Sequence, residues 1–445
     1  MKLAHVLLMG GEEVSQDLNN LFSSRQPAKI ETIADEADID SRLNEPGIDM
    51  IVVDDDHGAF ANDQKRHRLI HVLGNSKKPF IILSSKKDPA LIEEAKKSGA
   101  SDYVLKPYNH REFIMRFNAV AMGKTRISCI GGGTGLFTLL LGAKTLPNAL
   151  LTSIVNMSDD GGSSGKLSQS MGILPPGDIR RSLVALSNAP ELMNQIVQYR
   201  FDHSGVFQGH SFGNIFLAVL SQIKGSMPEA VRALSDILNI QGIVLPATVT
   251  LTKLVARFEN GQVVEGESKI DLCEGREGDL RIEKLWHEPE ATCDADAYSA
   301  IINSELVTIG PGDLFTSVIT NLTVKNIREA LAKTKAKKLY ICNLMTKPGE
   351  TSNFNAADHI REIIKYMGGD FLDYILISNT TLSKESIAEY AKKKQSPVKT
   401  GDMGSIRSLT KAQVITADIG NQKELVRHDS EKLKKEIQKI IQGIT

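Results

Sequence analysis

ISCIGGGTGLFTLLLGAKTL, residues 127–146, places three consecutive glycines between a short apolar run and a longer one. This order predicts a buried strand, a tight turn and a helix. Glycine lets backbone N–H groups approach a ligand closely, and the start of a helix favours negative charge. The stretch is an incomplete dinucleotide fingerprint, because Leu136 occupies the third glycine position. By itself it supports a nucleotide-binding turn and a turn for close helix–sheet packing equally.

The loop MSDDGGSSGKL, residues 157–167, follows the next strand-like run. It is not a Walker P-loop, because its glycines are too closely spaced and Leu167 stands where Ser or Thr should bind magnesium. Asp159 and Asp160 lie just past the second strand of a βαβ unit. An acid there can hold a ribose or a metal ion that bridges phosphates. The alternative is a turn capped by two acids.

A Pro-Pro-Gly turn opens the next predicted helix, in residues 171–186. Asp178 is placed to cap this helix, and Arg180 and Arg181 follow in its first turn. A positive charge there opposes the helix dipole. A bound anion and a solvent-facing arginine are equally good explanations.

Residues 198–220 place four polar side chains, Arg200, His203, His210 and Asn214, around glycines before an apolar helix. No second histidine lies at the helical spacing that a metal site favours. A histidine near a phosphate or ribose is the better interpretation, and a structural histidine is the alternative.

Two more strand-like runs end in glycine loops. Residues 306–322 run into Gly-Pro-Gly, and residues 341–354 run into Lys-Pro-Gly. Strands of one parallel sheet end at the same edge, which is the usual ligand position in doubly wound folds. We therefore expect these loops to meet at one crevice. A pair of strands around Asn260-Gly261 predicts a small hairpin insertion.

Residues 1–120 alternate strand-like and helix-like segments, as expected for a parallel sheet with helices on both faces. This segment resembles a response-regulator receiver domain, with Asp54 as the candidate phosphoacceptor and Ser84 and Lys106 as its partners. Receivers carry acids at the end of the first strand to hold magnesium, but this chain has Gly10-Gly11 there. We expect a degenerate receiver used for contact or dimerisation. The alternative is that a glutamate of the neighbouring Glu12-Glu13 pair restores the metal site.

The chain has 445 residues, enough for two or three domains, and a formal net charge of −1. That balance gives no electrostatic case for nucleic acid or an acidic membrane surface. The sequence shows no signal peptide and no run long enough to span a bilayer, so we expect a cytoplasmic protein without a membrane partner. The cysteines are far apart, which favours reduced thiols over disulfides or a zinc site: Cys129, Cys273, Cys293 and Cys342.

Ten motifs together resemble the gluconeogenesis factor family (YvcK-type), within the superfamily of the phospholactate transferase of coenzyme F420 synthesis (CofD-type). They include GGGTG, DDGGSSGKL, PPGDIR, GHSFGN, GPG and NLMTKPGET, in the family's order. The resemblance covers residues 126–380 and is expected to reach the C-terminus. It implies a Rossmann-like α/β fold, a homodimer, a UDP-N-acetylglucosamine-like ligand, and a role in carbon metabolism, cell shape and envelope synthesis.

The predicted fold class is therefore α/β, with a receiver-like (flavodoxin-like) domain at 1–122 and a larger Rossmann-like doubly wound domain at 126–445. Asp159 and Asp160 are the candidates for catalysis and for holding Mg²⁺. The resemblance implies that the following residues face the nucleotide sugar: Gly131, Gly132, Gly133, Thr134, Gly135, Asp159, Asp160, Gly161, Gly162, Ser163, Ser164, Asp178, Arg180, His210, Asn214, Gly310, Gly312, Thr316 and Ser317.

One residue departs from the family pattern. Asp313 stands after Gly-Pro-Gly, where the family usually has serine. A carboxylate beside a diphosphate costs affinity unless a cation lies between them. The sequence therefore predicts either a different ligand or a stronger metal dependence.

Two functions follow from these observations. The first is a nucleotide-sugar-binding regulatory protein without turnover, which we prefer by analogy with the family. The alternative is a magnesium-dependent transferase that moves a phospho-containing group from a nucleotide-activated donor. An oxidoreductase is disfavoured by the incomplete dinucleotide fingerprint. The sequence leaves open whether any reaction is catalysed.

Overall fold

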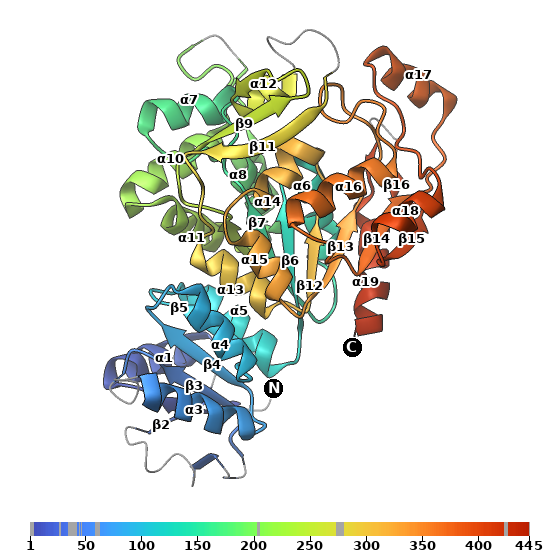
Figure 1. Ribbon diagram of the computed structural model, residues 1–445. Helices are drawn as coiled ribbons and strands as arrows, with labels where there is room; N and C mark the ends of the chain where they lie inside the picture. Colours follow the sequence, from blue (N-terminus) through green and yellow to red (C-terminus); the bar gives the residue numbers. More distant parts are fainter. Residues whose placement is uncertain are drawn as a thin grey trace. The chain divides into compact units, whose positions relative to one another are not determined.

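The computed structural model describes residues 4–25, 28–33, 42–43, 45, 47–57, 63–202, 205–272, 280–421 and 426–444. His203 and Cys273 of the sequence analysis lie outside these residues. The chain divides into two units (Figure 1). One consists of Met1–Thr125 with Tyr298–Asn303, and the other of Arg126–Ala297 with Ser304–Thr445.

The first unit is built on a five-stranded parallel sheet with the strand order β2-β1-β3-β4-β5. This is the flavodoxin-like order, which response-regulator receivers share, so the predicted fold class of this unit is confirmed. Its strands are β1 (Ala4–Met9), β2 (Ala28–Ile33), β3 (Met50–Asp54), β4 (Phe80–Ser84) and β5 (Asp102–Leu105). Its helices are α1 (Glu12–Arg25), α3 (Asp63–Asn75), α4 (Pro89–Lys97) and α5 (His110–Ala121).

The central strands of the first unit are buried on both faces. Every residue of β3 and β4 is buried, which explains their continuous apolar sequences. On one face the core contains three aromatic rings, Phe22 from α1 and Phe113 and Phe117 from α5. The strand β2 has no long apolar run like those of its neighbours, because the residues of AKIETI before Ile33 are half-buried or exposed.

The second unit is built on a seven-stranded sheet with the order β15-β14-β13-β12-β6-β7-β8 (Figure 1). The following strand pairs are parallel: β14 with β15, β13 with β14, β12 with β13, β12 with β6, and β7 with β8. The chain runs outward from β6 to β8, returns, and runs outward from β12 in the other direction. This is the Rossmann-like arrangement that the sequence predicts, with its switch point between β6 and β12. The strands are β6 (Thr125–Gly131), β7 (Ala149–Val155), β8 (Ile243–Pro246), β12 (Leu306–Ile309), β13 (Lys337–Ile341), β14 (Tyr374–Ser378) and β15 (Gln413–Ala417).

Helices connect these strands, and the apolar face of α6 packs against the last helix of the chain. A Cβ on Gly142 in α6 would lie 2.0 Å from the carbonyl oxygen of Ser430 in α19, so glycine permits the close approach. The helix α19 is amphipathic and buries Leu433, Ile437 and Ile440. The helices are α6 (Gly133–Ala143), α7 (Gly162–Met171), α8 (Gly177–Leu186), α9 (Glu191–Gln198), α10 (Phe212–Lys224), α11 (Met227–Ile237), α12 (Glu267–Leu272), α13 (Ala295–Asn303), the π-helix η3 (Leu314–Ile319), α14 (Thr320–Leu322), α15 (Ile327–Lys333), α16 (Ala356–Met367), α17 (Lys384–Lys392), α18 (Met403–Leu409) and α19 (Ser430–Ile444).

The predicted hairpin is present and carries a third strand. The strands β9 (Lys253–Phe258) and β10 (Val263–Glu265) pair antiparallel, and β11 (Ile282–Glu288) pairs with the other edge of β9. A two-stranded ribbon, β16 (Gly420–Asn421) with β17 (Arg427–His428), follows the large sheet. The strand β15 adds a further parallel strand to the large sheet after residue 380. Within the described residues, no helix combines the length and hydropathy needed to cross a bilayer.

Candidate functional site

Two glycine loops meet at the switch point of the large sheet. Ile130 at the end of β6 pairs with Ile309 at the end of β12, so the loops that follow emerge side by side. A Cβ on Gly135 would lie 2.6 Å from the carbonyl carbon and oxygen of Pro311. Only glycine therefore allows α6 to begin this close to the Gly310–Gly312 loop. The turn serves both packing and, by its position, ligand binding.

Asp178 does not cap its own helix, contrary to the prediction. The N-cap of α8 is Pro176, which makes no side-chain capping bond. Asp178 instead accepts a hydrogen bond from the backbone N–H of Gly133, at the start of α6. It also pairs with Arg181, whose Nη1 lies 3.1 Å from Oδ1. The carboxylate thus lies at the glycine turn.

The adjacent residues Asp159 and Asp160 have different environments. Asp160 accepts two hydrogen bonds on Oδ1, from the backbone N–H and the hydroxyl of Ser268, each at 2.8 Å. It therefore holds the start of α12. Asp159 accepts a bond from the N–H of Gly161 at 3.0 Å and lies near Asp178. The pair predicted as a joint magnesium site is thus divided, with Asp159 alone directed to the glycine turn.

Glu267 joins these acids and was not among the predicted site residues. Its Oε2 accepts a hydrogen bond from Ser158 at 2.6 Å. Burial, and after it the charges of Asp159 and Asp178, raise the pKa of Glu267 well above its usual value. Burial also raises the pKa values of Asp159 and Asp178. Several carboxyl groups in one recess need protons or a cation to coexist. Carboxylate oxygens are the donors that Mg²⁺ prefers, and Asp159 and Asp178 lie near enough to interact electrostatically.

A buried polar group fixes the serine loop. Asn214 donates to the hydroxyls of Ser163 and Ser164 at 3.2 and 3.4 Å, and accepts a bond from Arg180 at 2.8 Å. His210 lies 3.3 Å from the Ser163 hydroxyl. Arg180 is buried, so the solvent-facing alternative is wrong for this arginine. Burial lowers its pKa to about 10, and it stays protonated at neutral pH. These five predicted residues are brought together.

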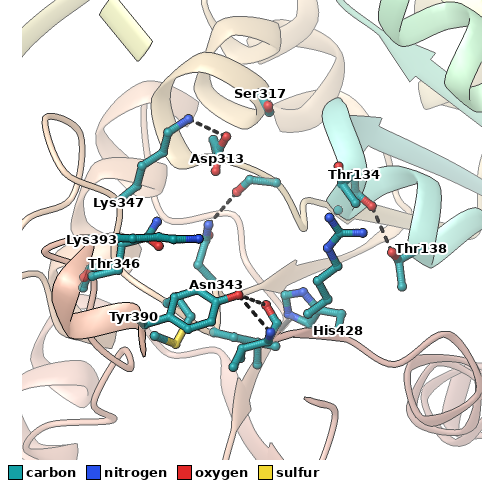
Figure 2. Close-up of a pocket in the computed structure, with 17 residues that line it drawn as sticks. Thr134, Thr138, Asp313, Ser317, Asn343, Thr346, Lys347, Tyr390, Lys393 and His428 are labelled. Carbon is teal, nitrogen blue, oxygen red and sulfur yellow. Dashed lines mark hydrogen bonds and ion pairs between the residues drawn. The ribbon is translucent and has the colours of Figure 1, made fainter. Parts of the chain in front are cut away.

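A cavity of about 370 Å³ opens on the other side of the glycine turn (Figure 2). Of the predicted residues, Thr134, Gly135, Gly312 and Ser317 line it. Thr316 does not, because its hydroxyl donates to Glu350 at 2.8 Å. The predicted residues therefore form two groups, one around Asp178 and one along this cavity, with the glycine turn between them.

The far wall of the cavity comes from the C-terminal part of the chain, which the sequence reasoning missed. Tyr390 and Lys393 lie at the end of α17, and Arg427 and His428 form β17. No ion pair joins Lys393 or Arg427 to any carboxylate of the described residues. Burial lowers the pKa of His428 to about 4, so its ring is neutral at pH 7. The only sequence signal was a basic residue pair, Arg427-His428.

Asp313 has an internal counter-ion. Lys347 Nζ lies 2.6 Å from Asp313 Oδ2 (Figure 2). It also lies 3.2 Å from Glu350 Oε1 and pairs with Asp271. Those three acids are the group of described residues whose oxygens lie close enough together to hold a metal ion. The lysine ammonium already contacts all three. The sequence predicted either a different ligand or a stronger metal dependence because of Asp313. The structure adds a third explanation, because Lys347 supplies a cation beside this carboxylate.

In the first unit, Asp54 ends β3, where the receiver resemblance places the phosphoacceptor. Lys106 Nζ lies 2.5 Å from Asp54 Oδ1 and 3.1 Å from Asp56 Oδ2. The hydroxyl of Ser84 donates to Asp55 at 2.9 Å rather than to Asp54. Glu12 and Glu13 are exposed in the first turn of α1, and none of the described acids forms a metal-binding group with Asp54. The arrangement favours the degenerate-receiver hypothesis.

We expect acetyl phosphate with Mg²⁺ to leave Asp54 unmodified. Phosphorylation would need a cation to offset the new charge, and the glycines at the end of β1 supply no carboxylate for it. Intact mass spectrometry of the full chain is the measurement, with Asp54→Asn as the background control. A phosphoryl adduct on the wild type that Asp54→Asn lacks would contradict the expectation.

The fold and site define an α/β protein with a Rossmann-like sheet and a polar cavity at its topological switch point. Residues 127–442 match the family model described as 2-phospho-L-lactate transferase CofD. A Clostridium acetobutylicum protein is 44% identical over 311 residues, covering 70% of this chain and 68% of that protein. The gluconeogenesis factor of Bacillus subtilis is 39% identical over 311 residues, covering 70% and 96%. A crystal structure of a UPF0052 family member from Bacillus halodurans shares 37% identity with a TM-score of 0.67, covering 71% of this chain and 99% of that one. The chain therefore belongs to the CofD family and, within it, to the gluconeogenesis factors.

Proposed function

We propose that the second unit binds a nucleotide sugar of the UDP-N-acetylglucosamine type and acts as a regulatory protein of carbon metabolism and cell shape. The observation that carries this proposal is the cavity at the switch point, beside the start of α6. Doubly wound sheets bind their ligands at this position. The homodimer and the Mg²⁺ ion that the resemblance implies stay predictions.

The chemistry of the lining fits the two ends of such a ligand. The unsatisfied N–H groups of a helix start favour phosphate oxygens, and Thr134 lies in the first turn of α6. Lys393 and Arg427 also line the cavity and add two positive charges, and β17, which carries Arg427, packs against α6. The Lys393 ammonium lies 5.9 Å from the centre of the Tyr390 ring. A diphosphate bound at the start of α6 beside these cations would be neutralised without a metal ion.

We expect Arg427→Gln to weaken the binding of UDP-N-acetylglucosamine by about 10- to 100-fold, because a hydrogen bond to a charged group contributes about 1.5–3 kcal/mol. Isothermal titration calorimetry with the full chain, with and without Mg²⁺, is the measurement. Arg407→Gln is the matched control, because Arg407 is exposed on α18 and does not line the cavity.

Two results would count against this proposal. A wild-type chain that gives no binding heat with or without Mg²⁺ would remove the nucleotide-sugar function. Equal affinities of Arg427→Gln and the wild type would place the ligand elsewhere.

The second candidate is a magnesium-dependent transferase. The acids around the glycine turn favour it, since Asp159, Asp178 and Glu267 have raised pKa values in one recess. A metal ion bound to Asp159 and Asp178 would supply charge neutralisation for a phospho-group. Chromatography of the nucleotide sugar after incubation with the protein, Mg²⁺ and candidate acceptors separates the two functions. Release of a nucleotide only when acceptor and Mg²⁺ are both present would favour the transferase.

A further inference from the structure

The cavity is lined by charges of both signs. Lys393 and Arg427 form no ion pair within the described part of the chain, and the Lys393 ammonium lies 5.9 Å from the centre of the Tyr390 ring. Asp313 lies at another wall with Lys347, and Figure 2 shows this pair on the side away from Tyr390 and His428. Lys347 also lines the cavity, and this position by itself would indicate that its ammonium binds an anionic ligand.

The contacts of Lys347 argue against that role. Its ammonium contacts the carboxylates of Asp313, Asp271 and Glu350. These three carboxylates raise its pKa, so the side chain stays charged and held in place. Burial raises the pKa of Glu350, but one ammonium cannot neutralise both Asp313 and Asp271, and this end of the cavity therefore carries excess negative charge.

Asp313 is the acid of this group that both lines the cavity and reaches solvent. Its side chain is 46% exposed, whereas that of Glu350 is fully buried. Glu350 also accepts bonds from the backbone N–H groups of Phe315 and Thr316, at 2.9 and 3.3 Å. One oxygen of Asp313 receives the lysine, and its carboxylate retains further lone pairs for a ligand.

We infer that Asp313 is a specificity-determining residue that accepts hydrogen bonds from the hydroxyl and amide groups of an uncharged sugar and repels a phosphate in the same place. This inference rests on the proposed function. A carboxylate can only accept hydrogen bonds, so it suits sugar hydroxyls and the N–H of an acetamido group. The cavity thus takes ligands with an anionic middle and an uncharged polyhydroxyl end, and it discriminates against nucleoside triphosphates.

The test compares two ligands that differ at one end. UDP-N-acetylglucosamine carries a sugar where UTP carries its terminal phosphate. In metal-free buffer we expect the wild type to prefer the nucleotide sugar. In Asp313→Asn the preference falls by about tenfold, because removing one charge at a few ångströms changes the interaction free energy by about 1 kcal/mol or more. Most of the change is expected as tighter binding of UTP.

Asp402→Asn is the matched control. Asp402 is the exposed N-cap of α18, asparagine caps a helix equally well, and the residue does not line the cavity. Asp313→Ser is a second variant for the same measurement should the amide disturb the loop. Both Asp313 variants leave Lys347 with two carboxylate partners, so its position is maintained.

The outcomes separate this inference from the proposed function. If the wild type binds the nucleotide sugar and neither Asp313 variant changes its preference over UTP, the inference is wrong and the function stands. If the wild type binds neither nucleotide, the proposed function fails, and inorganic pyrophosphate becomes the probe. Tighter binding of pyrophosphate by Asp313→Asn than by the wild type would then still support electrostatic selection, and equal binding would overturn it.

Discussion

Gly135→Ala is expected to destabilise the second unit by about 1–3 kcal/mol and to weaken nucleotide-sugar binding by at least about tenfold. The added Cβ would lie 2.6 Å from the Pro311 carbonyl carbon and 2.7 Å from the Gly312 nitrogen. Both neighbours are backbone, so no side chain can rotate to make room. Either α6 or the Gly310–Gly312 loop must move, and both line the cavity.

Two other glycines separate the effect on stability from the effect on binding. Gly142→Ala would clash with the Ser430 carbonyl at 2.0 Å, in the contact of α6 with α19, but Gly142 does not line the cavity. We expect it to lower stability while binding is largely retained. Gly443 in α19 has no atom within 4 Å of its Cβ position. Alanine there should stabilise slightly, because it is the better helix former.

Unfolding of the second unit can be followed by itself, because the chain has a single tryptophan and Trp286 lies in β11. Denaturant titrations monitored by its fluorescence would give the stability changes, and calorimetry would give the affinities. If Gly135→Ala unfolds at the same denaturant concentration as the wild type and binds equally well, the two loops do not meet as described.

The sequence was sufficient for the framework of the site, because that framework depends on glycine and strand order. The runs ending at Gly131 and Gly310 predicted strands of one sheet, and parallel strands end at a common edge. The receiver-like unit was predictable for the same reason, from buried runs such as those of β3 and β4. Backbone constraints of this kind leave a local trace in the sequence.

The hydrogen-bond partners of individual side chains could not be predicted from the sequence. Asp159 and Asp160 are adjacent and chemically identical, yet Ser268 binds only Asp160, across more than a hundred residues of chain. Asp178 seemed placed to cap α8, but Pro176 takes that position and the carboxylate reaches α6 instead. These choices depend on tertiary packing, which no periodicity in the sequence reports.

The two cavity-lining cations, Lys393 and Arg427, were also not predicted, because their position depends on the fold. Lys393 and Arg427 are ordinary surface-type residues, and neither belongs to a motif. They reach the cavity only because β17 and the end of α17 return to the carboxyl edge of the sheet. A charged residue far along the chain becomes part of a site through topology, so only the folded structure could identify it.

Acid should destabilise the second unit through His359, by about 2 kcal/mol between pH 7.5 and pH 5. His359 in α16 is fully buried, and its Nδ1 donates to the Asn355 carbonyl at 2.9 Å. Its Nε2 is buried without a hydrogen-bond partner in the described structure, beside the edge of the Phe354 ring. Protonation would place an uncompensated charge there, and burial accordingly lowers the pKa of His359 to about 4.

The sign follows from proton uptake. Below the ordinary histidine pKa of about 6.5 the unfolded chain binds a proton at this residue, and the folded chain does not until about pH 4. The contribution of neutral His359 to the free energy of unfolding is therefore fully present above about pH 6.5. It falls as the pH drops from there toward about pH 4. Asp294 acts in the opposite direction, because burial raises its pKa to about 6 and the folded state then favours acid. The wild-type profile alone would mix the two effects.

The variant His359→Phe isolates the histidine. Phenylalanine keeps an aromatic ring in the site but cannot titrate, and the Asn355 carbonyl retains its bond from the backbone N–H of residue 359. Denaturant titrations followed by Trp286 fluorescence give the free energy of unfolding of each protein. Between pH 7.5 and pH 5 the wild type should lose about 2 kcal/mol relative to the variant. A difference that stays constant across this range would mean that His359 is not buried in the neutral form.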